Sequence, residues 1–136
     1  MNLQMLKRAL ISYVSSKENE NLFDKYNINS RNAYINISTN VFVQIADSLS
    51  ILVKCDPDST YIVSHAFDGM DVFRACYIKS EPPSTGYFSL NAYSVTESPY
   101  GKILRVTTGQ DCKFLVVQIK KSFFYEVIET LQINKI

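Results

Sequence analysis

The segment CKFLVVQIKKSFFYEVIETLQ, residues 112–132, carries the densest apolar run in the chain and decides the expected fold. Its first half alternates with a period of two, as a buried strand does. One face of this strand carries Leu115, Val117 and Ile119, and the other carries Phe114 and Val116. We therefore predict a central strand over residues 114–119.

From Ser122 onward the apolar spacing becomes helical. Phe124, Val127, Ile128 and Leu131 recur at i, i+3, i+4 and i+7, which places them on one side of a helix. The hydroxyl of Ser122 can accept a hydrogen bond from the unpaired N–H groups of the first turn. We predict a C-terminal helix over residues 122–133, packed on the sheet and essential for stability.

Length and composition favour one folded domain over residues 1–136. Apolar residues make up 46% of the chain, and 9 Tyr and 8 Phe against 4 Gly suit a protein rich in β-sheet. A net charge of +1 argues against nucleic-acid binding. No apolar stretch approaches the length of a membrane span, and no secretory signal is visible, so we expect a cytoplasmic protein.

The cysteines favour the same compartment. Cys55, Cys76 and Cys112 show no Cys-x-x-Cys spacing, and with the single His65 they do not form a recognisable zinc set. We expect them to act as small apolar residues in a reducing compartment, with no metal and no cofactor.

The rest of the chain predicts an α+β fold. An amphipathic pattern favours an N-terminal helical segment over residues 1–26, and period-two patterns dominate an antiparallel sheet over residues 33–119. Thr39-Asn40 and Asp68-Gly69 read as two-residue hairpin turns. Short connections favour seven to eight short strands in a meander, forming a curved sheet or partly open barrel. From residue 33 onward this order of elements resembles pleckstrin-homology-type barrels, which implies little about function.

His65 is the only candidate for acid–base chemistry near neutral pH. The expected hairpin around Asp68-Gly69 places His65, Arg74 and Cys76 on one face, with Cys76 opposite Tyr61 and too far along the strand for activation by the imidazole. No nucleophile elbow, phosphate loop or zinc-protease motif is present. We predict that the protein is not an enzyme and keep a site centred on His65 as a minor alternative.

Two groups of residues could bind a partner or ligand. Asp47, Asp68 and Asp71 are expected at one end of the sheet, where they could dock a protein with a basic surface. Tyr100, expected to be exposed in a Pro-Tyr-Gly turn, could add to the contact. Lys120, Lys121 and Ser122 begin the expected helix, where two cations and free N–H groups could bind an anion.

These features favour a small protein-binding module that acts by docking on a partner protein, as an inhibitor, an immunity protein or an adaptor does. The alternative is a domain that binds a small ligand, phosphate or a lipid headgroup. A secretion chaperone or an enzyme centred on His65 is the third hypothesis.

Overall fold

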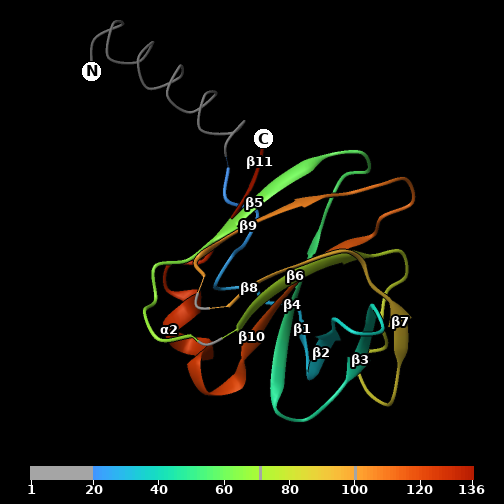
Figure 1. Ribbon diagram of the computed structural model, residues 1–136, viewed down its shortest axis with the longest axis horizontal. Helices are drawn as coiled ribbons and strands as arrows, with labels where there is room; N and C mark the ends of the chain where they lie inside the picture. The colour runs from blue at the N-terminus through green and yellow to red at the C-terminus, as the bar shows by residue number, and fades with distance from the viewer. Residues whose placement is uncertain (1–19, 71, 100) are drawn as a thin grey trace, which may run out of the picture.

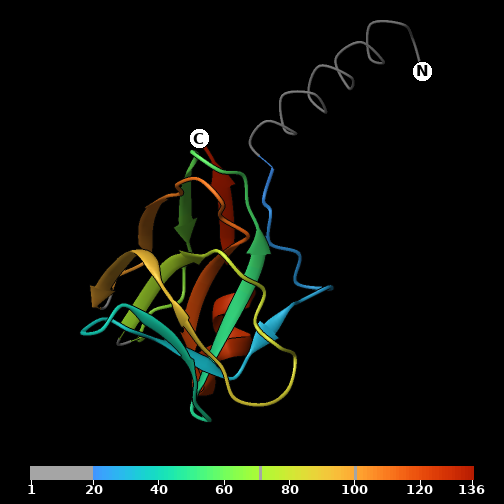
Figure 2. The same ribbon diagram turned by 90° about the vertical axis from the view of Figure 1, so that its right-hand side faces the viewer.

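The computed structural model describes residues 20–70, 72–99 and 101–136, which form three stacked antiparallel sheets and one short helical segment (Figures 1 and 2). The middle sheet has five strands, in the order β1 (Ser30–Arg31), β4 (Ser48–Lys54), β10 (Phe114–Lys120), β6 (Val72–Ile78) and β8 (Tyr93–Pro99). One outer sheet contains β11 (Gln132–Lys135), β5 (Thr60–Ser64) and β9 (Ile103–Thr107). The other contains β2 (Ala33–Asn36), β3 (Val41–Gln44) and β7 (Ser89–Asn91).

The predicted central strand is confirmed as β10. It pairs with β4 on one side and with β6 on the other, and all of its residues except Lys120 are buried. The predicted division of its faces is also confirmed. Leu115, Val117 and Ile119 belong to one apolar core, whereas Phe114 and Val116 belong to a second core on the opposite face.

Each core fills the space between the middle sheet and one outer sheet. The larger core joins the middle sheet to β11, β5 and β9, and its fully buried outer-sheet residues include Tyr61, Val63 and Ile133. The smaller core joins the opposite face to β2, β3 and β7, through Ile35 and Phe42 among others. A strand buried on both faces explains the nearly continuous apolar run in β10.

Three polar side chains of the middle sheet satisfy the free edge of β2. The Ile35 N–H donates to Gln118 Oε1 over 2.7 Å, and its carbonyl accepts from Arg74 Nη1 over 3.1 Å. The Ser50 hydroxyl donates to the Ala33 carbonyl over 2.8 Å. Buried backbone groups need such partners, which accounts for polar residues in the core of this sheet.

The α+β prediction is wrong, because the described chain is mostly β. The meander is also wrong, since among the described strands only β2 and β3 pair with their neighbour in sequence, and the strands are divided among three sheets. A turn at the predicted place joins β2 to β3, with Asn40 at a φ of 52°, but it contains the four residues 37–40 between the paired Asn36 and Val41 rather than the predicted two. In contrast, Asp68-Gly69 does not form a hairpin, because β5 pairs with β9 and β11 while β6 pairs with β10 and β8.

The predicted C-terminal helix over residues 122–133 is much shorter in the structure. A 3₁₀ turn, η1 (Lys121–Phe123), leads into α2 (Phe124–Ile128), and Ser122 lies inside that turn and does not cap it. All four residues of the predicted stripe are buried: Phe124, Val127, Ile128 and Leu131. After Ile128 the chain turns and pairs with β5 as β11, so backbone pairing in a sheet replaces the expected last turns.

The predicted N-terminal helical segment lies mainly outside the described residues, which begin at Glu20. Residues 20–26, its described part, are not helical. They run beside β11, with a bridge between Asn21 and Asn134. No helix within the described ranges is long and apolar enough to cross a membrane.

The central position of β10 predicts a large difference between two isoleucines. Ile119 in β10 is fully buried, whereas Ile103 in β9 is 65% exposed. Ile119→Ala should lower the free energy of unfolding by about 2–5 kcal/mol, because it leaves a cavity in the larger core. Ile103→Ala, the matched control, should cost less than about 1 kcal/mol. Urea unfolding measures both, and similar losses would contradict the central role of β10.

Candidate functional site

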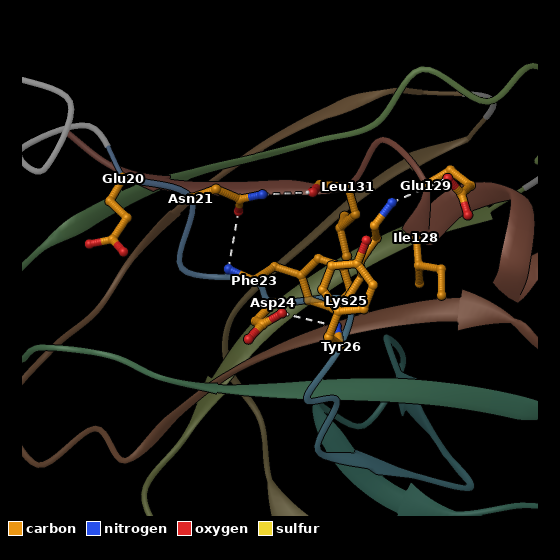
Figure 3. Close-up of a pocket in the computed structure, with 9 residues that line it drawn as sticks. All are labelled: Glu20, Asn21, Phe23, Asp24, Lys25, Tyr26, Ile128, Glu129 and Leu131. Carbon is orange, nitrogen blue, oxygen red and sulfur yellow. Dashed lines mark hydrogen bonds and ion pairs between the residues drawn. The ribbon is translucent and has the colours of Figure 1, made fainter. Parts of the chain in front are cut away.

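A groove of about 400 Å³ lies between residues 20–26, here called the N-terminal strap, and the end of α2 (Figure 3). The floor is apolar and consists of Phe23, Ile128 and Leu131, each less than 10% exposed. Charged and aromatic side chains surround this floor. The groove therefore combines an apolar centre with a polar rim, as protein-binding surfaces do.

Asn21 fixes the strap to the C-terminal segment. Its amide nitrogen donates to the Leu131 carbonyl over 3.1 Å, and its Oδ1 accepts from the N–H groups of Phe23 and Ile133 over 3.0 and 2.8 Å. The Leu22 N–H adds a bond of 2.8 Å to the Ile133 carbonyl. One asparagine thus satisfies three backbone groups, and it places Phe23 in the larger core.

A tight turn then presents Lys25 and Tyr26 to solvent. Asp24 Oδ1 accepts from the Tyr26 N–H over 2.9 Å, and the Asp24 carbonyl accepts from the Asn27 N–H over 3.1 Å. Such side-chain bonds to the backbone two residues ahead are typical of aspartate turns. As a result the Tyr26 side chain is 88% exposed.

The opposite wall of the groove comes from α2. Glu129 follows this helix and forms an ion pair of 3.5 Å with Lys25 across the groove. Tyr125 lies four residues before Glu129, so the two residues share one face of the helix. Tyr125 is 77% exposed. Tyr26 therefore lines the groove itself, whereas Tyr125 lies on α2 next to it and is not one of the lining residues.

The rim of the groove is acidic. Glu20, Asp24 and Glu129 contribute three carboxylates, and Lys25 is the one cation among the lining residues. Lys25 Nζ also lies 5.4 Å from the centroid of the Tyr26 ring. The groove thus offers carboxylates and the Tyr26 hydroxyl as hydrogen-bond acceptors beside an apolar floor.

The predicted acidic end of the sheet is only partly described. Asp71 and Tyr100 lie outside the described residues. Asp68 forms an ion pair with Lys102, which lowers the pKa of its carboxyl group. The grouping of Asp68 with Asp47 rests on a meander, which the structure does not have, so the grouping itself stays a prediction.

The predicted anion site is a shallow hollow of about 370 Å³ lined by Asp47, Lys120, Lys121 and Ser122. The structure therefore groups Asp47 with the two lysines. A carboxylate at this position opposes the binding of an anion. Lys120 Nζ also lies 5.6 Å from the centroid of the Phe123 ring.

His65 follows β5 and is 6% exposed. Its Nδ1 accepts from the Phe67 N–H over 3.1 Å, and its ring meets the Phe73 ring edge-on at 4.7 Å. Phe73 belongs to the larger core and Cys76 to the smaller one, so the middle sheet separates His65 from Cys76. Arg74 is paired with Glu97 over 2.5 Å. The three residues therefore do not form the cluster that the expected hairpin implied.

Sequence reasoning missed the groove because it assigned its strap to a helix. The available signal was the pair of turn formers, Asn21 and Asp24, each two residues before a backbone N–H that it binds. Such residues favour caps and turns over helix interiors. Tyr125 could be placed on the polar side of α2, since it falls between the buried stripe positions.

Within the described ranges, no group of three or more His, Cys, Asp or Glu side chains is arranged to hold a metal ion. The sequence matches no family model, no curated protein and no solved structure. The candidate site therefore has to be interpreted from its own chemistry.

The buried position of His65 predicts a pH-dependent stability. Burial lowers the pKa of its imidazole below 6.5, the nearby Lys102 cation lowers it further, and the Gly101 carbonyl opposes both. The unfolded chain thus binds a proton at a higher pH than the folded chain does, so the free energy of unfolding should fall as the pH decreases below about 6.5.

His65→Asn isolates this contribution, because an asparagine oxygen can accept from the Phe67 N–H and does not titrate. Urea unfolding from pH 8 to pH 5 should show the loss in the wild type and a smaller loss in the variant. Parallel pH profiles for the two proteins would contradict the assignment to His65.

Proposed function

We propose that the protein is a protein-binding module and that it docks on its partner through the groove between the N-terminal strap and α2. The observation that carries this proposal is Tyr26, which lines the groove beside its apolar floor and is 88% exposed. Tyr125, on the neighbouring helix α2 and four residues before the groove residue Glu129, adds a second tyrosine that is 77% exposed. Tyrosine supplies a large, rigid contact area with a polar tip, and it is enriched among residues that dominate binding energy.

The charge of the rim supports a partner with a basic surface. The rim carries one cation, Lys25, and three carboxylates, those of Glu20, Asp24 and Glu129. Because Lys25 forms an ion pair with Glu129 alone among these carboxylates, a lysine or arginine of the partner can pair with another of them. Such pairs at a solvated rim raise the association rate and the specificity more than the affinity. An inhibitor, an immunity protein or an adaptor would use the groove in this way, in the cytoplasm.

A second acidic contact at Asp47, Asp68 and Asp71 stays a prediction. Asp68 is already paired with Lys102, so a partner would have to compete for its charge. Binding of phosphate or a lipid headgroup by Lys120, Lys121 and Ser122 is the weaker alternative, because Asp47 lines the same hollow. A catalytic role of His65 has the least support, since its Nδ1 is bonded to the backbone and its ring is buried.

Affinity capture from the producing cell, followed by mass spectrometry, identifies candidate partners, and titration calorimetry then measures each one. The double variant Tyr26→Ser and Tyr125→Ser should weaken binding of the true partner at least about tenfold, because both aromatic anchors are removed. Thermal unfolding should change little, since both side chains are exposed.

Tyr87→Ser is the matched control. Tyr87 is 74% exposed and precedes β7, on the opposite side of the molecule from α2 (Figure 1). This variant should bind as the wild type does. Equal losses for the control and the double variant, or no loss for either, would contradict docking through the groove.

A further inference from the structure

Two of the three cysteines lie in contact although they are far apart in the sequence. Cys55 directly follows β4, and Cys112 precedes β10, the strand with which β4 pairs through Lys54 and Phe114. Their Sγ atoms are 3.3 Å apart, with the Cys55 thiol donating to Cys112 Sγ. The Cys112 thiol lies 3.6 Å from the Cys55 carbonyl oxygen. Cys76, in contrast, is fully buried in the smaller core.

The two sulfur atoms are already in contact. A sulfur–sulfur bond of about 2.05 Å requires the two atoms to approach by roughly 1.2 Å. Both cysteines lie outside the strands, next to the loops that contain Asp58 and Asp111, residues with a positive φ. Movement by this amount therefore does not require the β4–β10 pairing to break.

The pair borders solvent in part, since Cys55 is half-buried and Cys112 is 8% exposed. It lines an open hollow of about 540 Å³ together with Lys54 and Lys113, whose side chains are exposed, and with Asp56 and Glu81. A hollow of this size accepts a small peptide. Two cations and the Glu81 carboxylate, together with Asp56, which also pairs with Lys135 over 2.9 Å, offer charges of both signs to a zwitterionic peptide disulfide such as glutathione disulfide.

We propose that Cys55 and Cys112 form a thiol–disulfide exchange site, which small peptide disulfides of the glutathione class oxidise to an internal disulfide. In the first step one protein thiolate attacks a sulfur of the small disulfide, forms a mixed disulfide and releases one small thiol. In the second step the other protein thiolate attacks the protein sulfur and releases the second small thiol. Overall, two protein thiols are oxidised, one small disulfide is reduced to two thiols, and the bond cross-links the start of β10 to the end of β4.

The surroundings of Cys55 set the rate of this exchange. Burial raises the pKa of its thiol, and the hydrogen bond to Cys112 and the neighbouring charges of Cys112 and Asp56 raise it further. Only the thiolate attacks a disulfide, so exchange through Cys55 is slow at neutral pH and accelerates as the pH rises.

The test exposes the reduced full-length protein to excess glutathione disulfide, blocks the remaining thiols with an alkylating agent, and maps the peptides by mass spectrometry. The expected product has lost two hydrogen atoms, contains a Cys55–Cys112 cross-link and keeps Cys76 free. Excess reduced glutathione should reverse it. The thermal midpoint of the oxidised form should lie about 5–10 °C above that of the reduced form.

Cys76→Ala is the matched control and should form the same cross-link with the same thermal shift. Cys55→Ser should form no internal disulfide. Oxidation in urea should yield pairs that include Cys76, because selectivity depends on the folded contact. Two results would overturn the proposal. One is a stable glutathione adduct on the protein without an internal disulfide. The other is that Cys55 and Cys112 stay reduced under conditions that fully oxidise dithiothreitol. Neither of these results depends on a variant that folds.

Discussion

The burial of both faces of β10 is the constraint on which the rest of the structure depends. Leu115, Val117 and Ile119 require one covering layer, and Phe114 and Val116 require another. A single sheet with one solvated face cannot meet both needs. The chain meets them by placing a three-stranded sheet on each face of the five-stranded middle sheet, and it separates neighbours in sequence, such as β5 and β6, into different layers.

This constraint explains how much of the fold could be predicted from the sequence. Local signals sufficed for β10, for the faces of its side chains and for the turn at Asn40, where a positive φ suits asparagine. They failed at Asp68-Gly69, although Gly69 also has a positive φ of 106°. The residues at Asp68-Gly69 do favour a turn, but the burial of apolar side chains far apart in the sequence decides which strands pair. As a result β5 pairs with β9 and β11 and not with β6.

The candidate groove depends on a contact that no local pattern encodes. Tyr26 is exposed because Asn21 binds the backbone of Leu131 and Ile133, more than 100 residues away in the sequence. That contact exists only because the chain leaves α2 early and returns as β11. The apolar stripe was predictable, because its last residue, Leu131, is buried as expected. The length of the helix was not predictable. Pairing of residues 132–135 with β5 ended the helix before the stripe did.

The groove and the dithiol lie at opposite ends of β10, since Cys112 precedes the strand and α2 follows it. Seven residues of strand separate them by roughly 20 Å, a distance at which substitutions act additively. The strand β11 links the surroundings of both sites, through Ile133 to Asn21 and through Lys135 to Asp56. An exposed ion pair contributes about 0.2–1 kcal/mol at most, so this link transmits little. Oxidation of the cysteines should therefore stabilise the fold without altering the affinity of the groove, and a partner bound there should not protect the thiols.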